Sequence, residues 1–232
     1  MKTIGLIGGM SWESTAIYYR LMNEMVRERL GGVHSARLLL WSFDFADIAG
    51  RQHAGDWDGA TALMVDAARR LEDGGAAALV ICTNTMHRMA QEVQAAVSIP
   101  LIHIADPTAG AMKAAGVSRP ILLATRFTME QEFYKGRLAA RHGIIAPTVP
   151  DAAGRDAVHR VIYEELVRGV VTAPSKAAYL AEVARVRERT DVDSLILGCT
   201  EITMLVGQAD FDIPVFDTTA LHAAAAVDFA LA

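Results

Sequence analysis

Short apolar runs alternate with longer amphipathic stretches along almost the whole chain of 232 residues. The first run, residues 4–7, ends at Gly8-Gly9, and the helical pattern that follows stops at Gly31-Gly32. The run 77–81 is apolar at every position, which is typical of a strand buried on both faces of a parallel sheet. Strands that alternate with helices predict βαβ units with right-handed crossovers. The sequence therefore predicts an α/β fold with mostly parallel sheets.

The remaining segments continue this alternation. Further strands are expected at 37–43, 99–104, 121–124, 144–149, 194–197 and 213–216. Helices are expected at 58–73, 86–97, 152–168, 176–189 and 219–232. The stretch after the second strand, which includes Arg51 and Gln52, is interpreted as a polar connection.

An internal repeat divides the chain. Residues 6–9 resemble 122–125, and residues 80–85 resemble 196–201. Positions 6 and 83 are 77 residues apart (83 − 6), as are positions 122 and 199 (199 − 122). The repeat predicts two pseudo-symmetric α/β lobes, the first made of residues 1–105 with 216–232 and the second of residues 106–215. A chance similarity between two βαβ units is the alternative, which the matched separations disfavour.

The repeat also predicts where a ligand binds. Ligands of open α/β sheets lie at the carboxyl ends of the strands. If the two lobes face each other, the turns at 8–11, 82–85, 125–128 and 199–201 surround one cleft. The turn at 83–85 opens a predicted helix, whose N–H groups and positive dipole end favour a carboxylate.

Two cysteines lie in or after these strands. Cys82 continues an apolar strand and is interpreted as a core side chain. Cys199 lies between Gly198 and Thr200 at a strand end, where a helix N-terminus is expected to lower the thiol pKa and suit it to proton transfer. His87 either orients a cleft residue or is a packed, hydrogen-bonded helix residue, and the second interpretation is favoured. Trp12 either walls an apolar pocket or packs beneath the first helix.

Composition excludes several classes of function. The formal net charge of −5 disfavours nucleic-acid binding, which requires a basic surface. Two cysteines cannot build a disulfide framework or a Cys-rich zinc site, and no cluster has metal-ligand spacing. No apolar run reaches the ~20 residues that span a bilayer, and the N-terminal run breaks too early for a signal peptide. We expect a cytoplasmic protein that binds a small molecule, without nucleic acid or membrane partners.

The turn motifs, taken together and in order, carry a resemblance. Residues 8–14, 82–87, 125–129 and 198–202 make the chain resemble the aspartate/glutamate racemase family, most closely its branch of broad-specificity amino-acid racemases from enteric bacteria. The resemblance implies two pseudo-symmetric lobes with a substrate cleft between them and a last helix that packs on the first lobe. It also implies activity without pyridoxal phosphate or any other cofactor, and a homodimer.

The resemblance implies a two-base mechanism, in which one group from each lobe faces the substrate Cα. Family members commonly carry Cys-Asn-Thr in the first lobe, where this chain has Thr83-Asn84-Thr85. The repeat pairs Thr83 with Cys199, and Cys82 points to the opposite face of its strand. Thr83 and Cys199 are thus the predicted catalytic residues, and the weakly basic threonine predicts slow, lopsided racemisation. The predicted substrate-binding residues are Met10, Gln52, Asn84, Thr85, Thr125, Thr128, Thr200 and Glu201.

Substrate and reaction stay partly open at this point. Gln52 stands where acid-specific relatives would place a cation, which favours relaxed selectivity, although Arg51 and Arg160 leave acidic substrates open. One alternative is a related decarboxylase or cis–trans isomerase of small dicarboxylic acids, which uses a single cysteine. Another is a sensor that binds an amino acid without turnover. A thiol–redox role is disfavoured because the chain has no C-x-x-C motif.

Overall fold

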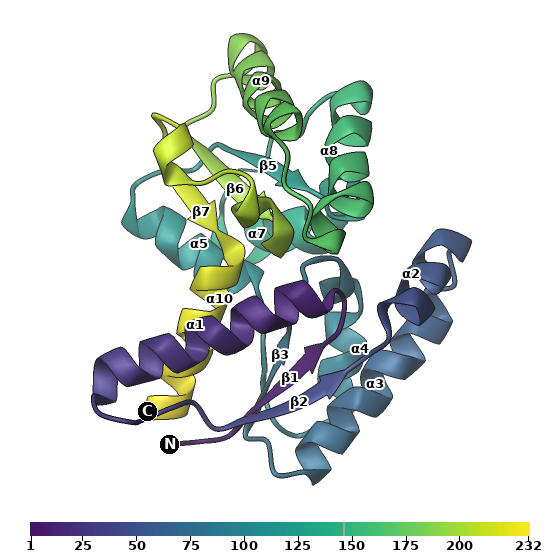
Figure 1. Cartoon of the computed structure of the whole chain (residues 1–232), viewed down its shortest axis with the longest axis vertical. Helices are drawn as coiled ribbons and strands as arrows, with labels where there is room; N and C mark the ends of the chain where they lie inside the picture. The colour runs from purple at the N-terminus through teal and green to yellow at the C-terminus, as the bar shows by residue number, and fades with distance from the viewer. Residues whose placement is uncertain (146) are drawn as a thin grey trace. The chain divides into compact units, whose positions relative to one another are not determined.

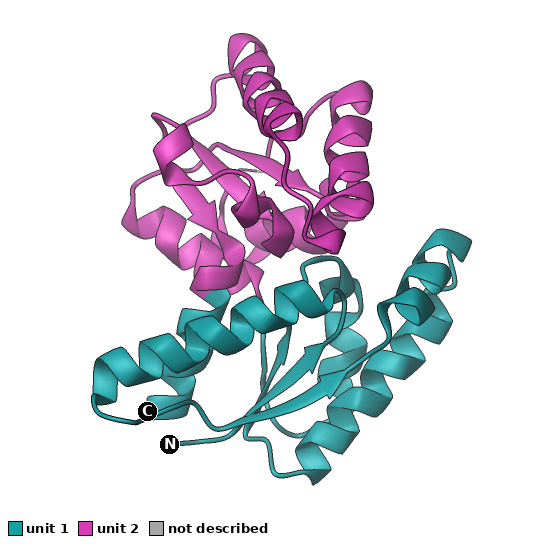
Figure 2. Cartoon of the chain, in the orientation of Figure 1, with its two compact units in different colours: residues 1–103, 222–232 teal, residues 104–221 magenta. Residues whose placement is uncertain are grey.

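Parallel strands form the centre of each of two units in the computed structural model, which describes residues 1–145 and 147–232 (Figure 1). The first unit consists of residues 1–103 and 222–232, and the second of residues 104–221 (Figure 2). The sequence predicted that the chain returns to the first lobe at residue 216, whereas in the structure it returns to the first unit at residue 222. The reason is that the last strand of the chain pairs inside the second unit.

The first unit holds a four-stranded sheet in the order β2-β1-β3-β4, in which every pair is parallel. Its strands are β1 (Ile4–Gly8), β2 (Leu38–Ser42), β3 (Ala78–Ile81) and β4 (Leu101–Ile102). Its helices are α1 (Trp12–Leu30), α2 (Phe45–Ala54), α3 (Trp57–Asp73), the 3₁₀ segment η1 (Thr85–Met89) and α4 (Ala90–Ala95). The final helix, α10 (Thr218–Leu231), enters this unit at His222.

Both faces of this sheet are covered, as an all-apolar central strand requires. Leu6 and Val80 point toward α1 and α10 and pack there with Tyr18. Their neighbours Ile7 and Leu79 point to the other face and pack against α2, α3 and α4. Figure 1 shows α1 and α10 together on one side of the sheet. The last helix thus packs on the first unit, as the family resemblance implied.

The second unit holds a three-stranded parallel sheet in the order β5-β6-β7. Its strands are β5 (Pro120–Ala124), β6 (Ser194–Gly198) and β7 (Val215–Asp217). Its α-helices are α5 (Ala105–Ala114), α6 (Arg126–Glu130), α7 (Glu132–His142), α8 (Ala152–Glu164) and α9 (Ala173–Arg189). Its 3₁₀ segments are η2 (Leu166–Arg168), η3 (Thr200–Met204) and η4 (Gln208–Asp210). One apolar cluster joins the strands to α5, α7, α8 and α9. The predicted α/β class with mostly parallel sheets is confirmed.

The strand register repeats between the units. Leu6 lies opposite Val80 and Leu122 opposite Ile196, an offset of 74 residues in each unit (80 − 6 and 196 − 122). Extending both strand pairs by the same number of residues places Thr83 and Cys199 at equivalent positions.

A glutamine fastens the next strand in both units. The Gln94 side chain accepts from the Leu101 N–H at 2.8 Å and donates to the Ile99 carbonyl at 3.0 Å. Gln208 makes the same two bonds in the second unit, to the Val215 N–H at 2.9 Å and the Ile213 carbonyl at 3.1 Å. The strand register and the glutamine contacts therefore both repeat, and chance similarity between the halves does not explain this agreement.

Three predicted elements need correction. The polar connection after β2 is the helix α2, which begins at the N-cap Asp44 and ends at Gly55 in the left-handed conformation. The helix predicted at 86–97 is the short η1 followed by α4. Of the strand predicted at 144–149, Thr148 forms one parallel bridge with Ile121, and residue 146 lies outside the described residues.

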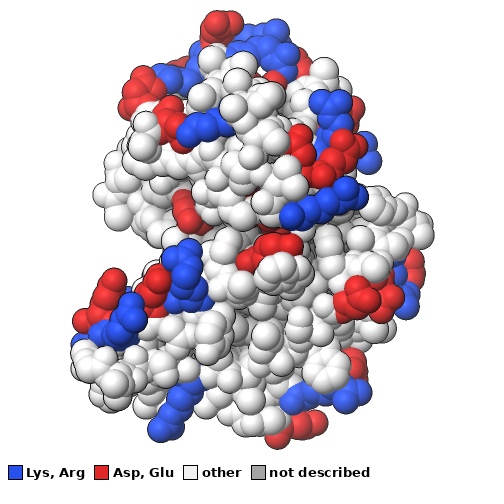
Figure 3. All heavy atoms as spheres, viewed as in Figure 1, with Lys and Arg blue, Asp and Glu red and all other residues white. Residues whose placement is uncertain are grey.

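Charged side chains of both signs are interspersed over the face that Figure 3 shows. Among residues 1–145 and 147–232, no helix is both long and apolar enough to span a membrane.

Candidate functional site

In the first unit, the predicted residues lie where β1 and β3 end. The two strands are parallel neighbours, and the Cys82 N–H continues their ladder by donating to the Ile7 carbonyl at 2.9 Å. Thr83 follows and is half-buried, whereas Asn84 and Thr85 are buried. Neighbouring parallel strands carry their carboxyl ends at the same sheet edge, so the turn of Thr83 lies beside the Gly8-Gly9 turn.

The Gly8-Gly9 turn lies close against the chain that leaves β2. Gly9 has a φ of 79°, and a Cβ added there would lie 2.2 Å from the Phe43 carbonyl oxygen, so only glycine fits. The Gly9 N–H donates to the Thr15 hydroxyl at 2.8 Å, which ties the turn to the first turn of α1. Met10 is buried in the core with α2 and α3, while Trp12 is 67% exposed and so does not pack beneath the helix.

Gln52 lies on α2 and is buried, which corrects its predicted place in a solvated loop. Its Nε2 donates to the Met86 sulfur at 3.3 Å, so Gln52 touches the segment that carries Thr83–Thr85. Arg51, on the same helix, forms an ion pair with Asp56. Asp56 is the N-cap of α3, so the charge of Arg51 is neutralised by the residue that begins the next helix.

Cys82 and Thr83 have different surroundings. Cys82 is fully buried in the cluster formed with α1 and α10, and burial raises the pKa of its thiol. Thr83 lies outside that cluster and keeps part of its surface exposed. These observations support the interpretation of Cys82 as a core side chain.

In the second unit, the predicted residues follow β5 and β6, which are parallel neighbours with Ala124 opposite Gly198. Thr125 caps α6: its hydroxyl accepts from the Thr128 N–H at 3.4 Å and lies 3.3 Å from the Thr128 hydroxyl. Thr200 accepts a hydrogen bond from Thr219 at 3.0 Å. The structure thus brings Thr125, Thr128, Cys199, Thr200 and Glu201 to one sheet edge.

The Cys199 thiol is buried and donates to the Glu201 carboxylate, with 2.8 Å between Sγ and Oε2. Burial, the charge of Glu201 and this hydrogen bond together raise the thiol pKa well above its ordinary value. The backbone N–H groups of Glu201 and Ile202 oppose the rise but do not outweigh it. The expected lowering of the Cys199 pKa is therefore wrong.

The segments after β3 and β6 explain part of this error. Both are 3₁₀ segments of five residues, η1 and η3, rather than α-helices. Few peptide dipoles align in such a short segment, so it supplies little of the positive potential expected at a helix N-terminus. The carboxylate-binding site predicted at 83–85 also relied on a helix dipole, and the short segment η1 supplies little of it.

Two tyrosines that the sequence did not single out lie in or pack against the same apolar cluster as Cys199. Burial, together with the charge of Glu201, raises the pKa of Tyr163 on α8 and of Tyr179 on α9. The Tyr163 ring lies 4.6 Å from the ring of His159, whose Nδ1 accepts from the Arg126 N–H at 3.3 Å. In the sequence, the i, i+4 spacing of His159 and Tyr163 on a predicted helix could have drawn attention to this pair. No sequence pattern linked that helix to the strand that precedes Cys199.

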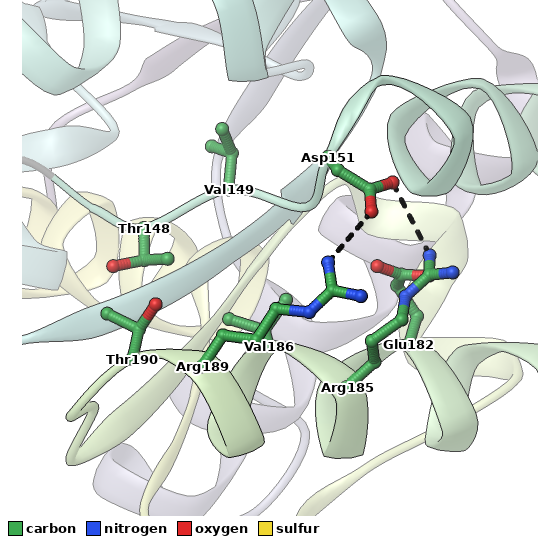
Figure 4. A pocket seen from close by; sticks show the side chains of 8 residues that line it. All are labelled: Thr148, Val149, Asp151, Glu182, Arg185, Val186, Arg189 and Thr190. Carbon is green, nitrogen blue, oxygen red and sulfur yellow. Dashed lines mark hydrogen bonds and ion pairs between the residues drawn. The ribbon is translucent and has the colours of Figure 1, made fainter.

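Two cavities lie apart from these strand ends. One of about 200 Å³ lies between the segment 148–151 and α9, where Asp151 forms ion pairs with Arg185 and Arg189 (Figure 4). The other, of about 470 Å³, lies along α2 and includes Arg51 and Asp56. Neither is lined by a predicted site residue. Among residues 1–145 and 147–232, no group of three or more His, Cys, Asp or Glu side chains is arranged to hold a metal ion.

Comparison with known proteins decides the family. The model of the Asp/Glu/hydantoin racemase family matches residues 7–226. The chain belongs to this family. The broad specificity amino-acid racemase RacX of Bacillus subtilis is 21% identical to this racemase. The match covers 99% of the present chain and 98% of RacX.

Solved structures agree with this assignment. A protein of Yersinia pestis assigned to the Asp/Glu racemases is 50% identical, with a TM-score of 0.91 and full coverage of both chains. An aspartate racemase homologue of Pyrococcus horikoshii is 31% identical, with a TM-score of 0.86 and full coverage of both chains. The predicted enzyme class, an isomerase that racemises amino acids, is confirmed.

Proposed function

We propose that this racemase acts on a broad range of amino acids without a cofactor, using Cys199 and Thr83 as its two proton-transfer groups. The observation that carries the proposal is the Cys199–Glu201 hydrogen bond at the end of β6, with Thr83 at the equivalent register position after β3. Racemisation needs one group on each face of Cα, because a single base tends to return the proton to the face it left.

The raised pKa of Cys199 defines the resting state: the thiol is protonated and shares its proton with Glu201. A substrate α-ammonium group that binds near Glu201 offsets the carboxylate charge and so favours the thiolate. The thiol proton then moves to Glu201, and the thiolate removes the α-proton. The Thr83 hydroxyl donates to the opposite face, and solvent returns the proton held by Glu201 to Thr83. Reversing these steps converts the other enantiomer.

The carbanionic transition state needs electrostatic stabilisation. We propose that Asn84, Thr85, Thr125, Thr128 and Thr200 supply hydrogen bonds to the substrate carboxylate and ammonium groups. All five are buried at strand ends, where fixed donors act with little screening by water. Met10 stays part of this proposal as an apolar contact.

Relaxed substrate selectivity is supported by the local environment of Gln52. Its amide is neutral and bonded to Met86, and neighbouring Arg51 is paired with Asp56, so neither presents an unpaired charge to a second carboxylate. The broad specificity in the name of the Bacillus subtilis relative points the same way. The homodimer implied by the family resemblance and the cytoplasmic location expected from the sequence composition complete the proposal.

The purified protein is expected to convert L-amino acids to their D-enantiomers after dialysis against a chelator and treatment with a carbonyl reagent. Chiral chromatography of all proteinogenic amino acids, each incubated separately, measures this. Turnover of several apolar and polar substrates supports the proposal. Loss of turnover after either treatment contradicts cofactor independence, and turnover of aspartate or glutamate alone contradicts broad specificity.

The pH dependence provides a second test. The Glu201 charge raises the Cys199 pKa, so Glu201→Gln lowers it and makes the thiolate available at lower pH. We expect the rising limb of kcat/KM against pH to move to lower pH in Glu201→Gln. Glu201→Asp keeps the charge and serves as the matched control, with its limb near that of the wild type. A limb that does not move in Glu201→Gln excludes Glu201 as the group that sets the thiol pKa.

A related decarboxylase is the second candidate, and one observation favours it. A protonated thiol such as Cys199 can deliver a proton to a carbanion left by loss of CO₂, and this one-sided reaction needs no basic partner at Thr83. Release of CO₂ from small dicarboxylic acids, without racemisation of any amino acid, would favour this candidate over racemisation.

A further inference from the structure

A buried histidine, His87, forms a hydrogen bond with the backbone of the turn that carries Thr83. His87 lies on η1, is only 2% exposed, and its Nδ1 is 2.8 Å from the Thr83 carbonyl oxygen. A carbonyl oxygen can only accept, so Nδ1 carries the proton and donates. This bond spans four residues and closes the segment that leads from β3 into η1.

His87 does not stand alone. Its ring lies 4.6 Å from the ring of His103 and 5.6 Å from the ring of His222, measured between centroids. His103 follows β4 and is 5% exposed, and His222 lies on α10 and is fully buried. The rings of His103 and His222, from two other parts of the first unit, thus both pack against the ring of His87.

The far side of this cluster is also fixed. Nε2 of His222 is 2.7 Å from the Ile102 carbonyl oxygen, so Nε2 carries a proton and donates. Its Nδ1 then accepts from the Tyr18 hydroxyl at 2.8 Å, since Tyr18 is buried and its O–H is the donor available. These bonds tie α1, β4 and α10 to one ring.

We infer that His87 is a positioning residue for Thr83, and that the His103–His222–Tyr18 cluster behind it keeps the His87 ring in place. This inference rests on the proposed function, in which Thr83 transfers a proton. The bond to the Thr83 carbonyl sets the peptide plane between Thr83 and Asn84, and through it the direction of the Thr83 hydroxyl. Since misplacing a reacting group by 1 Å costs on the order of 100-fold in rate, a fixed turn is required on this side.

Two substitutions separate the hydrogen bond from the packing of the ring. His87→Asn keeps an N–H donor at nearly the position of Nδ1 but loses the ring. His87→Phe keeps an aromatic ring against His103 but loses the donor. A purely structural role predicts that the phenylalanine variant is the more active of the two, whereas positioning through the bond predicts the reverse.

We expect His87→Phe to lower the kcat of racemisation by about 10- to 100-fold while KM changes by less than about threefold. His87→Asn is expected to retain most of the wild-type kcat. Solvent deuterium enters the Cα of the enantiomer that Cys199 deprotonates, and this exchange is expected to continue in His87→Phe because it does not require Thr83. Equal kcat in His87→Phe and the wild type, or equal loss of both reactions, overturns the inference.

Hydrogen–deuterium exchange of the backbone separates this inference from the proposed function. Amides in residues 82–89 are expected to exchange faster in His87→Phe than in His87→Asn or the wild type. If the wild type racemises no amino acid, the proposed function fails, and the exchange comparison still decides whether His87 holds the turn. Unchanged exchange in a folded His87→Phe variant overturns the inference whatever the activity.

Discussion

Replacing Cys199 by serine is expected to lower racemisation in both directions by about 100-fold or more, the range over which positioned acid–base groups contribute. The thiol and the Glu201 carboxylate share one proton at 2.8 Å. A serine hydroxyl in the same place is a much weaker acid, so it cannot pass its proton to Glu201 and become a base. Rates measured from each pure enantiomer by chiral chromatography test both directions.

Cys82→Ala is the matched control. Cys82 has the same side chain and is also buried, but it packs in the core with α1 and α10 rather than beside a carboxylate. We expect wild-type turnover and a modest loss of thermal stability from the small cavity that alanine leaves. A Cys82→Ala enzyme as inactive as Cys199→Ser would show that the register equivalence of Thr83 and Cys199 does not identify the catalytic pair.

Thr83→Cys is expected to raise turnover by about tenfold or more, because it places a thiol where wild-type Thr83 offers only a weakly basic alcohol. The gain should be largest for the enantiomer whose α-proton leaves toward this side. The equilibrium constant between free enantiomers is one, so the substitution changes rates and not the final ratio. Initial rates from both enantiomers of several amino acids measure the effect.

Deuterium incorporation adds an internal control for Thr83→Cys. In D₂O, the wild type is expected to introduce deuterium into one enantiomer faster than it racemises that enantiomer, because proton removal on the Cys199 side is the easier step. The cysteine variant should reduce this difference. Unchanged or slower racemisation in a folded Thr83→Cys enzyme, for every amino acid tested, would remove Thr83 from the catalytic pair.

The positions of the strand ends were predictable because their signals are local. An apolar run such as 77–81 is typical of a strand covered on both faces. The equal 77-residue separations aligned Thr83 with Cys199 before any register was known. The structure then supplies the register, with its offset of 74 residues in both units. The helix α2 was missed although Asp44 and Gly55 mark its two ends.

The chemistry at those strand ends was less predictable. The Cys199 pKa depends on burial and on the direction of the Glu201 side chain two residues later, and a sequence shows neither. His222 and Tyr18 are 204 residues apart, so no local pattern links them or places them behind His87. Long-range contacts decide these properties, and only the folded chain brings them together.

The return of α10 to the first unit has a consequence for biosynthesis. The second unit is one continuous segment, 104–221, whereas the first is completed only by residues 222–232. The Lys2 N–H donates to the Ala230 carbonyl at 2.8 Å, so the two ends of the chain meet in that unit (Figure 1). Until residues 222–232 leave the ribosome, α1 alone covers the face of β1 and β3 on which α10 packs in the folded protein. The second unit, residues 104–221, can therefore fold before the first unit is complete. During that time residues 1–103 expose an apolar surface of the kind that chaperones bind.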